Sequence, residues 1–114
     1  MARVDIPVTT ITRDGVAPPS QVSSVAADDH VIDGNDGRVF LEAENVDAAS
    51  AHTVTVLTPG TVAGLAIADL AVSVPLSSIR WIGPFPQTVF NQVGLDDVHI
   101  DVATANLRFR AYRI

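Results

Sequence analysis

Apolar and polar residues alternate over several short segments, and most of these segments end at a glycine, proline or asparagine turn. In the clearest segment, His52 to Thr58, Val54 and Val56 take one side, and Thr53 and Thr55 take the other. About eight such segments follow one another at spacings of roughly 8–12 residues, which is typical of a sandwich or barrel. We therefore predict one all-β domain, an antiparallel β-sandwich of jelly-roll-like or immunoglobulin-like type.

The composition supports this fold class and excludes several kinds of function. The chain has 114 residues and is 47% apolar but only 5% aromatic, so its core is built mainly from small and β-branched side chains. With no cysteine, it can form neither disulfides nor cysteine-based metal sites. Its net charge of −6, without any lysine, argues against a nucleic-acid partner. No apolar run is long enough for a membrane span.

Two segments predict which strand faces are buried. In the segment from Arg38 to Asn45, Val39, Leu41 and Ala43 share the inward face, opposite Phe40, Glu42 and Glu44. In the last segment, Leu107, Phe109 and Ala111 lie opposite Arg108, Arg110 and Tyr112. The outward arginines are expected to pair with acids of a neighbouring strand. The segments 38–45 and 52–58 are expected to form an antiparallel hairpin.

The segment Arg80-Trp81-Ile82-Gly83-Pro84-Phe85-Pro86 concentrates large apolar side chains beside two prolines. The prolines fix a rigid, extended corner. Trp81 ends a short strand and is predicted to fill the core. For Phe85 the sequence allows two positions, one in the core and one on a surface that contacts a partner. A further short strand is expected over residues 88–92.

Residues 1–27 are predicted to form an extended N-terminal arm and linker, and residues 28–114 the β-sandwich domain. Pro7 suits an edge strand or an arm, and Pro18-Pro19 lies in a segment without apolar periodicity. An arm of this kind commonly orders only against a neighbour. The alternative is a short strand followed by a surface loop.

No arrangement of residues predicts catalysis, and we expect a non-enzymatic protein without a cofactor or a metal. Residues 28–37 are acidic and only faintly resemble a calcium loop, because no glutamate follows at the required position and Asp-Gly turns explain the same residues. His30, His52 and His99 lack the spacing of a metal or triad site.

Four segments together resemble small virion-associated proteins encoded among the structural genes of tailed bacteriophages and prophages of actinobacteria. The segments are Val8 to Arg13 with Pro18-Pro19, Thr53-Val54-Thr55-Val56 with Thr58-Pro59-Gly60, Arg80 to Pro86, and Leu107 to Tyr112. The resemblance covers most of the chain, and Trp-Ile-Gly-Pro-Phe-Pro is its most distinctive part.

What this resemblance implies is a structural role in the virion as a capsid decoration (cement) protein, made in the host cytoplasm. The expected partners are the major capsid protein, or another virion protein, and further copies of the chain in a homo-oligomer. Neither a nucleic acid nor a membrane is an expected partner. The alternatives are a head–tail joining or tail protein, and a carbohydrate- or ligand-binding module. The residues predicted to contact the partner are Ile6, Pro7, Val8, Ile11, Arg13, Pro18, Pro19, Phe85, Arg108 and Arg110.

Overall fold

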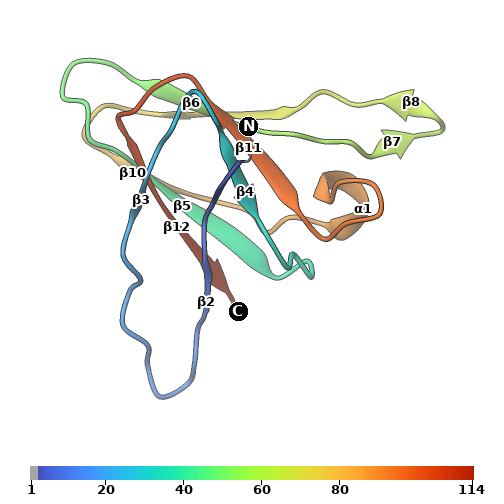
Figure 1. The fold of residues 1–114 in the computed structure, drawn as a ribbon, viewed down its shortest axis with the longest axis horizontal. Helices are drawn as coiled ribbons and strands as arrows, with labels where there is room; N and C mark the ends of the chain where they lie inside the picture. Colours follow the sequence, from blue (N-terminus) through green and yellow to red (C-terminus); the bar gives the residue numbers. More distant parts are fainter. Residues whose placement is uncertain (1–2) are drawn as a thin grey trace.

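The computed structural model describes residues 3–114, which form a sandwich of two β-sheets with a two-stranded hairpin at one end (Figure 1). The predicted all-β sandwich is confirmed. In chain order the elements are β1 (Val4–Asp5), β2 (Val8–Thr10), β3 (Val22–Ser23), β4 (His30–Ile32), β5 (Val39–Asn45), β6 (His52–Val56), β7 (Thr61–Val62), β8 (Leu65–Ala66), β9 (Leu70–Val74), β10 (Ile79–Ile82), α1 (Gln87–Phe90), β11 (Val98–Val102) and β12 (Leu107–Arg113).

The two sheets turn their apolar faces toward each other. One sheet has the order β1-β4-β11-β6-β9, and the other has the order β10-β5-β12-β2, with β3 also pairing with β12. The contact between β1 and β4 and that between β12 and β2 are parallel, and the other strand pairs are antiparallel. The longest ladder joins β5 to β12 in register from Leu107 with Asn45 to Arg113 with Val39.

The faces predicted for β5 and β12 are confirmed. Val39, Leu41 and Ala43 are fully buried, as are the alternate residues of β12 from Leu107 to Ala111. Arg110 lies opposite Glu42 on the outer face, and their side chains form the predicted ion pair at 3.0 Å.

The predicted hairpin of residues 38–45 with 52–58 is wrong, because β5 and β6 belong to different sheets. The chain crosses from one sheet to the other after Asn45, whose buried side chain donates to the carbonyls of Ser50 and Val74. A buried polar group must find such partners. The asparagine therefore stabilises a crossover between the sheets, where the sequence predicted a hairpin connection within one sheet.

The N-terminal segment is part of the sandwich rather than a loose arm. In the described part of the predicted arm 1–27, β1 pairs with β4 in one sheet and β2 pairs with β12 in the other, so the chain changes sheets between them. Ile6, which lies where the chain changes sheets, is fully buried in the core, and Val8 packs against this core. Residues 1 and 2 lie outside the described residues. The alternative of a short strand followed by a surface loop describes residues 4–21 better, since residues 11–18 are exposed. The chain between β2 and β3 loops out beyond the strands (Figure 1).

The strand expected over residues 88–92 is also different in the structure. Residues 87–90 form the helical turn α1, in which the Pro86 carbonyl accepts from the amides of Val89 and Phe90. Proline suits the start of a helix because its fixed φ is already helical and it has no amide to satisfy. Pro86 therefore ends the corner and begins this turn.

We expect Ile6→Ala to lower the free energy of unfolding by about 2–5 kcal/mol, because it leaves a cavity between the two sheets. Urea unfolding would measure this loss. The control is Val16→Ala in the exposed loop, which should change stability by less than about 0.5 kcal/mol. Equal, small losses for the two variants would mean that the N-terminal strands do not contribute to the core.

Candidate functional site

Trp81 lies on the outer face of the β10-β5-β12-β2 sheet and is 74% exposed. The prediction that it fills the core is wrong. In β10 the register places Trp81 opposite Glu42 and places Ile82 opposite the buried Leu41. Because side chains alternate along a strand, burial of Ile82 turns Trp81 outward.

The indole of Trp81 is held in place by a chain of charged groups beneath it. Its Nε1 donates to Oε1 of Glu42 at 3.0 Å, and Arg110 Nη1 donates to Oε2 of the same carboxylate at 3.0 Å. Arg110 Nε also donates to the carbonyl of Pro19 at 2.8 Å. Glu42 is only 8% exposed, so both of its oxygens are occupied within the protein. The exposed ring is therefore oriented before any partner arrives.

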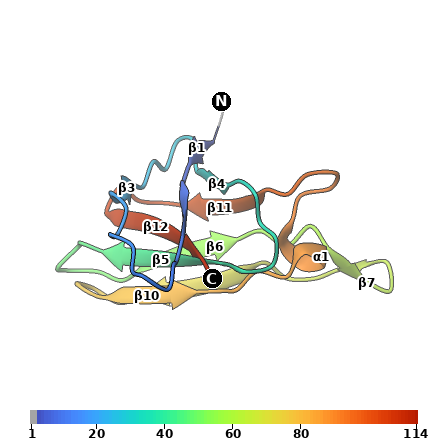
Figure 2. The ribbon, with the colours of Figure 1, turned by 90° about the horizontal axis from the view of Figure 1, so that it is seen from below.

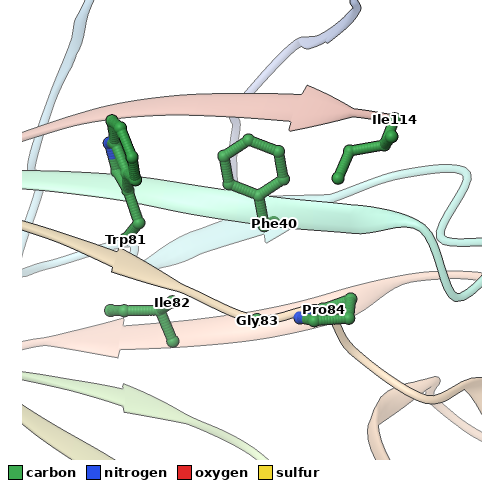
Figure 3. A pocket seen from close by; sticks show the side chains of 6 residues that line it. All are labelled: Phe40, Trp81, Ile82, Gly83, Pro84 and Ile114. Atoms are coloured by element: carbon green, nitrogen blue, oxygen red, sulfur yellow. The ribbon is translucent and has the colours of Figure 1, made fainter.

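Phe40 and Tyr112 extend the apolar surface beside Trp81. Their rings stack with centroids 5.3 Å apart, and Figure 3 shows Phe40, Trp81 and Ile114 on the same side of the sheet. Gly83 allows the corner to approach this surface, because a Cβ at this position would lie 2.9 Å from the Cβ of Phe40. Its φ of +129° is also a conformation that other residues rarely adopt.

We call the surface of Ile11, Phe40, Trp81, Tyr112 and Ile114 the aromatic face. Two shallow hollows of about 240 and 290 Å³ lie in this surface, each lined by both Trp81 and Phe40 and otherwise largely by apolar side chains. The charged groups within it, Glu42 and Arg110, already satisfy each other. A surface with an aromatic centre and neutralised charges is suited to a protein partner, since Trp, Tyr and Arg are the residue types enriched at binding hot spots.

The ten predicted contact residues do not form one surface. Ile11 and Arg110 lie at the aromatic face, and Pro19 touches it through its carbonyl. Ile6 and Phe85 are fully buried, so their predicted contact with a partner is wrong. The other predicted residues are at least partly exposed elsewhere; they are Pro7 and Val8 at β2, Arg13 and Pro18 in the loop 11–21, and Arg108 on β12.

Phe85 belongs to the buried part of the corner and is fully enclosed in the core. Its ring packs edge-on against Phe90 with centroids 5.3 Å apart. The buried side chain of Asn35 donates to the Phe85 carbonyl at 3.0 Å and to Oδ1 of Asn91 at 2.6 Å. Asn35, which the faint calcium-loop pattern included, thus ties the acidic segment to the corner. This role was not predicted from the sequence.

An acidic cluster lies where β1, β4 and β11 meet. A hydrogen bond with Asp33, then burial and the charges of Asp33, Asp96 and Asp5, raise the pKa of Asp97 to about 6. Burial, followed by the influence of Asp33, also raises the pKa of Asp5. Among residues 3–114 no group of three or more acidic or histidine side chains has the arrangement needed to hold a metal ion.

The three histidines occupy separate places. His30 is fully buried and its Nε2 accepts from the amide of Val25, while burial lowers its pKa. His52 contacts Asp47 at 2.8 Å. His99 lies on β11, where burial and then Arg3 lower its pKa. Each histidine has its own structural surroundings, and the fold does not bring them together.

Comparison of the chain with protein-family models, with curated protein sequences and with solved structures gave no match in any of the three. Among residues 3–114 no helix has the length and apolar character needed to cross a membrane. The aromatic face and the sequence segments that build it are therefore the features that bear on function.

Removing the Glu42 carboxylate should loosen Trp81. We expect Glu42→Ala to lower the fluorescence anisotropy of Trp81, which is the chain's one tryptophan. The same change should lower the free energy of unfolding by about 1–3 kcal/mol, because Arg110 and the indole lose their acceptor. The control is Glu44→Ala, which removes the acceptor of Gln21 instead. If both variants leave the anisotropy at the wild-type value, the hydrogen bond does not orient the ring.

Neutralising Asp97 should stabilise the protein at neutral pH. Its pKa of about 6 lies above the usual 3.8, so the folded state pays for ionising it as pH rises through 6. We expect Asp97→Asn to unfold at higher urea concentration than the wild type at pH 7, with the difference vanishing near pH 4. His30, whose pKa is lowered, changes the stability of both proteins with pH in the opposite direction. This contribution cancels when the stability of the variant is compared with that of the wild type at each pH. A difference that is constant across this pH range would contradict the assignment.

Proposed function

We propose that this chain is a non-enzymatic structural protein of a phage virion, a capsid decoration protein that binds the assembled head through its aromatic face. The observation that carries the proposal is the exposed Trp81, fixed by Glu42 within an apolar sheet surface. A solvent-exposed tryptophan costs free energy in the isolated protein, and burial against a partner would recover it.

The segments behind the phage resemblance support this choice of face. Val8 to Arg13, Arg80 to Pro86 and Leu107 to Tyr112 are far apart in the sequence, but they contain β2, β10 and β12 of the same sheet. Thr53 to Val56 lies in the other sheet. Three of the four resembling segments therefore contribute to the surface around Trp81.

The geometry favours a protein over a small polar ligand. The hollows beside Trp81 are open and apolar, whereas a small-molecule site encloses its ligand and offers a few free polar groups. The Glu42 and Arg110 side chains are already engaged with each other. A shallow face of this kind gives modest affinity per copy, and a capsid lattice compensates by presenting many equivalent sites.

A carbohydrate-binding module is the second candidate, because Phe40, Trp81 and Tyr112 place three aromatic rings on one sheet face. A glycan array distinguishes it from the first. A reproducible signal that Trp81→Ala abolishes would favour the sugar-binding function.

The decoration function predicts that the purified chain cosediments with emptied capsids of the phage that encodes it. Trp81→Ala should weaken this binding at least about thirtyfold, the loss expected for a central hot-spot residue. The matched control is Val93→Ala, which truncates an even more exposed apolar side chain outside the aromatic face. If the two variants bind capsids equally well, the aromatic face is not the surface that binds the capsid.

Mass spectrometry and cryo-electron microscopy of the same particles would test the role itself. Hundreds of copies on the outer shell are expected for a decoration protein, whereas a handful at one vertex would indicate a head–tail joining protein. Absence of the chain from the particles, together with no binding to emptied capsids, would overturn the structural role.

A further inference from the structure

Residues 53–79 form a region in which charge is nearly absent although most of the side chains are exposed. Its one charged side chain is Asp69, where about five would be expected from the chain average of 18%. The region includes β7, β8, β9 and the turn that leads to β10. Six of the chain's exposed large apolar side chains lie between residues 62 and 81; they are Val62, Leu65, Leu70, Leu76, Ile79 and Trp81.

Asp69 carries the one charge of this region, and its carboxylate is hydrogen-bonded locally. Its Oδ1 accepts from the amide of Thr58 at 2.9 Å and from the Thr58 hydroxyl at 3.2 Å. These contacts fix the base of the β7–β8 hairpin. The hairpin extends beyond the sandwich in two perpendicular views (Figures 1 and 2), and Val62 and Leu65 in it are 64% and 71% exposed.

The strand that follows the hairpin, β9, has an open edge. It is the last strand in the order of its sheet and pairs with β6 on one side. Within residues 3–114, no hydrogen bond joins the backbone of residues 70–73 to a segment other than β6. An uncharged edge strand without proline is a template for pairing with another strand, and proteins that avoid such pairing place charges or prolines there.

We propose that β9 pairs antiparallel with β9 of a second copy of this chain, so that one sheet continues through a twofold dimer. A twofold axis makes the pairing self-complementary, since each copy offers the same edge. Charge favours this place for a second copy. Each copy carries a net charge of −6, so two copies repel over most of their surfaces but not where charge is absent.

The same arrangement accounts for the exposed hairpin. If the pairing is centred on Val72, Leu70 of one copy faces Val74 of the second copy, and the hairpin that precedes β9 runs past the end of the other strand. It then reaches the turn between β9 and β10 of the second copy, where Leu76 is exposed, and the start of β10, where Ile79 is exposed. The uncharged hairpin of each copy therefore covers apolar surface of the other.

Sedimentation of the purified chain at concentrations up to about 100 μM tests the dimer, and no capsid is needed. The expected mass is twice 12.0 kDa. Ala71→Lys combined with Ser73→Lys should weaken association at least tenfold, about 1.4 kcal/mol, because in this register the new ammonium groups of one copy face those of the other. Both positions are exposed, so the fold should persist, and circular dichroism checks this.

A charge-swapped variant tests the register. Ala71→Lys combined with Ser73→Asp places opposite charges across the pair and should retain the dimer. Val16→Lys adds a charge to the exposed loop 11–21 and should leave the mass unchanged. Hydrogen exchange should show protection of the β9 amides that rises with protein concentration.

A monomer at every concentration would overturn the proposal, as would a dimer that the two-lysine variant forms as tightly as the wild type. If the charge-swapped variant dissociates as readily as the two-lysine variant, the proposed register is wrong. These outcomes do not depend on the decoration function, because a dimer that fails to bind capsids would contradict only that function.

Discussion

The antiparallel ladder between β5 and β12 is the constraint on which both the core and the aromatic face depend. Its register fixes Leu41, Ala43 and Phe109 inside, and by the same alternation it fixes Glu42 and Arg110 outside. A slip of one residue would exchange the two sets. Burial on one side of the ladder therefore determines which side chains are available to a partner on the other side.

The two faces of each strand in this ladder could be predicted from the sequence because both strands alternate clearly, but the pairing of β5 with β12 was not predicted. The inward and outward faces of β5 and β12 were predicted, and so was the pairing of Arg110 with an acid. The position of Trp81 was not, because Ile79-Arg80-Trp81-Ile82 has apolar residues in both phases of a two-residue period. Its orientation depends on Ile82, which lies opposite Leu41, and this contact between distant segments leaves no local signal.

The N-terminal strands and Asn35 show the same limit in another form. The segment around Ile6 is short and contains a proline, so its own pattern does not distinguish a free arm from a strand that changes sheets. The segment becomes a strand that changes sheets because it pairs with β4 and β12, which are distant in the sequence. Asn35 follows an Asp-Gly turn, and its local sequence indicates a turn residue alone, yet its side chain donates to the carbonyl of Phe85. Neither contact leaves a periodic signature.

The two apolar regions of the surface differ in the state of their backbone, and this difference favours different partners. Over the middle of the aromatic face the backbone of β5 and β12 is already paired on both sides, so a partner that lies on these two strands gains side-chain contacts alone. At β9 the backbone is open, so the partner that gains most is another strand. The turn at residues 75–78 connects β9 to β10, the strand that carries Trp81. Pairing through β9 would therefore hold two aromatic faces in a fixed relation, so that a capsid lattice with matching spacing would bind both copies at once.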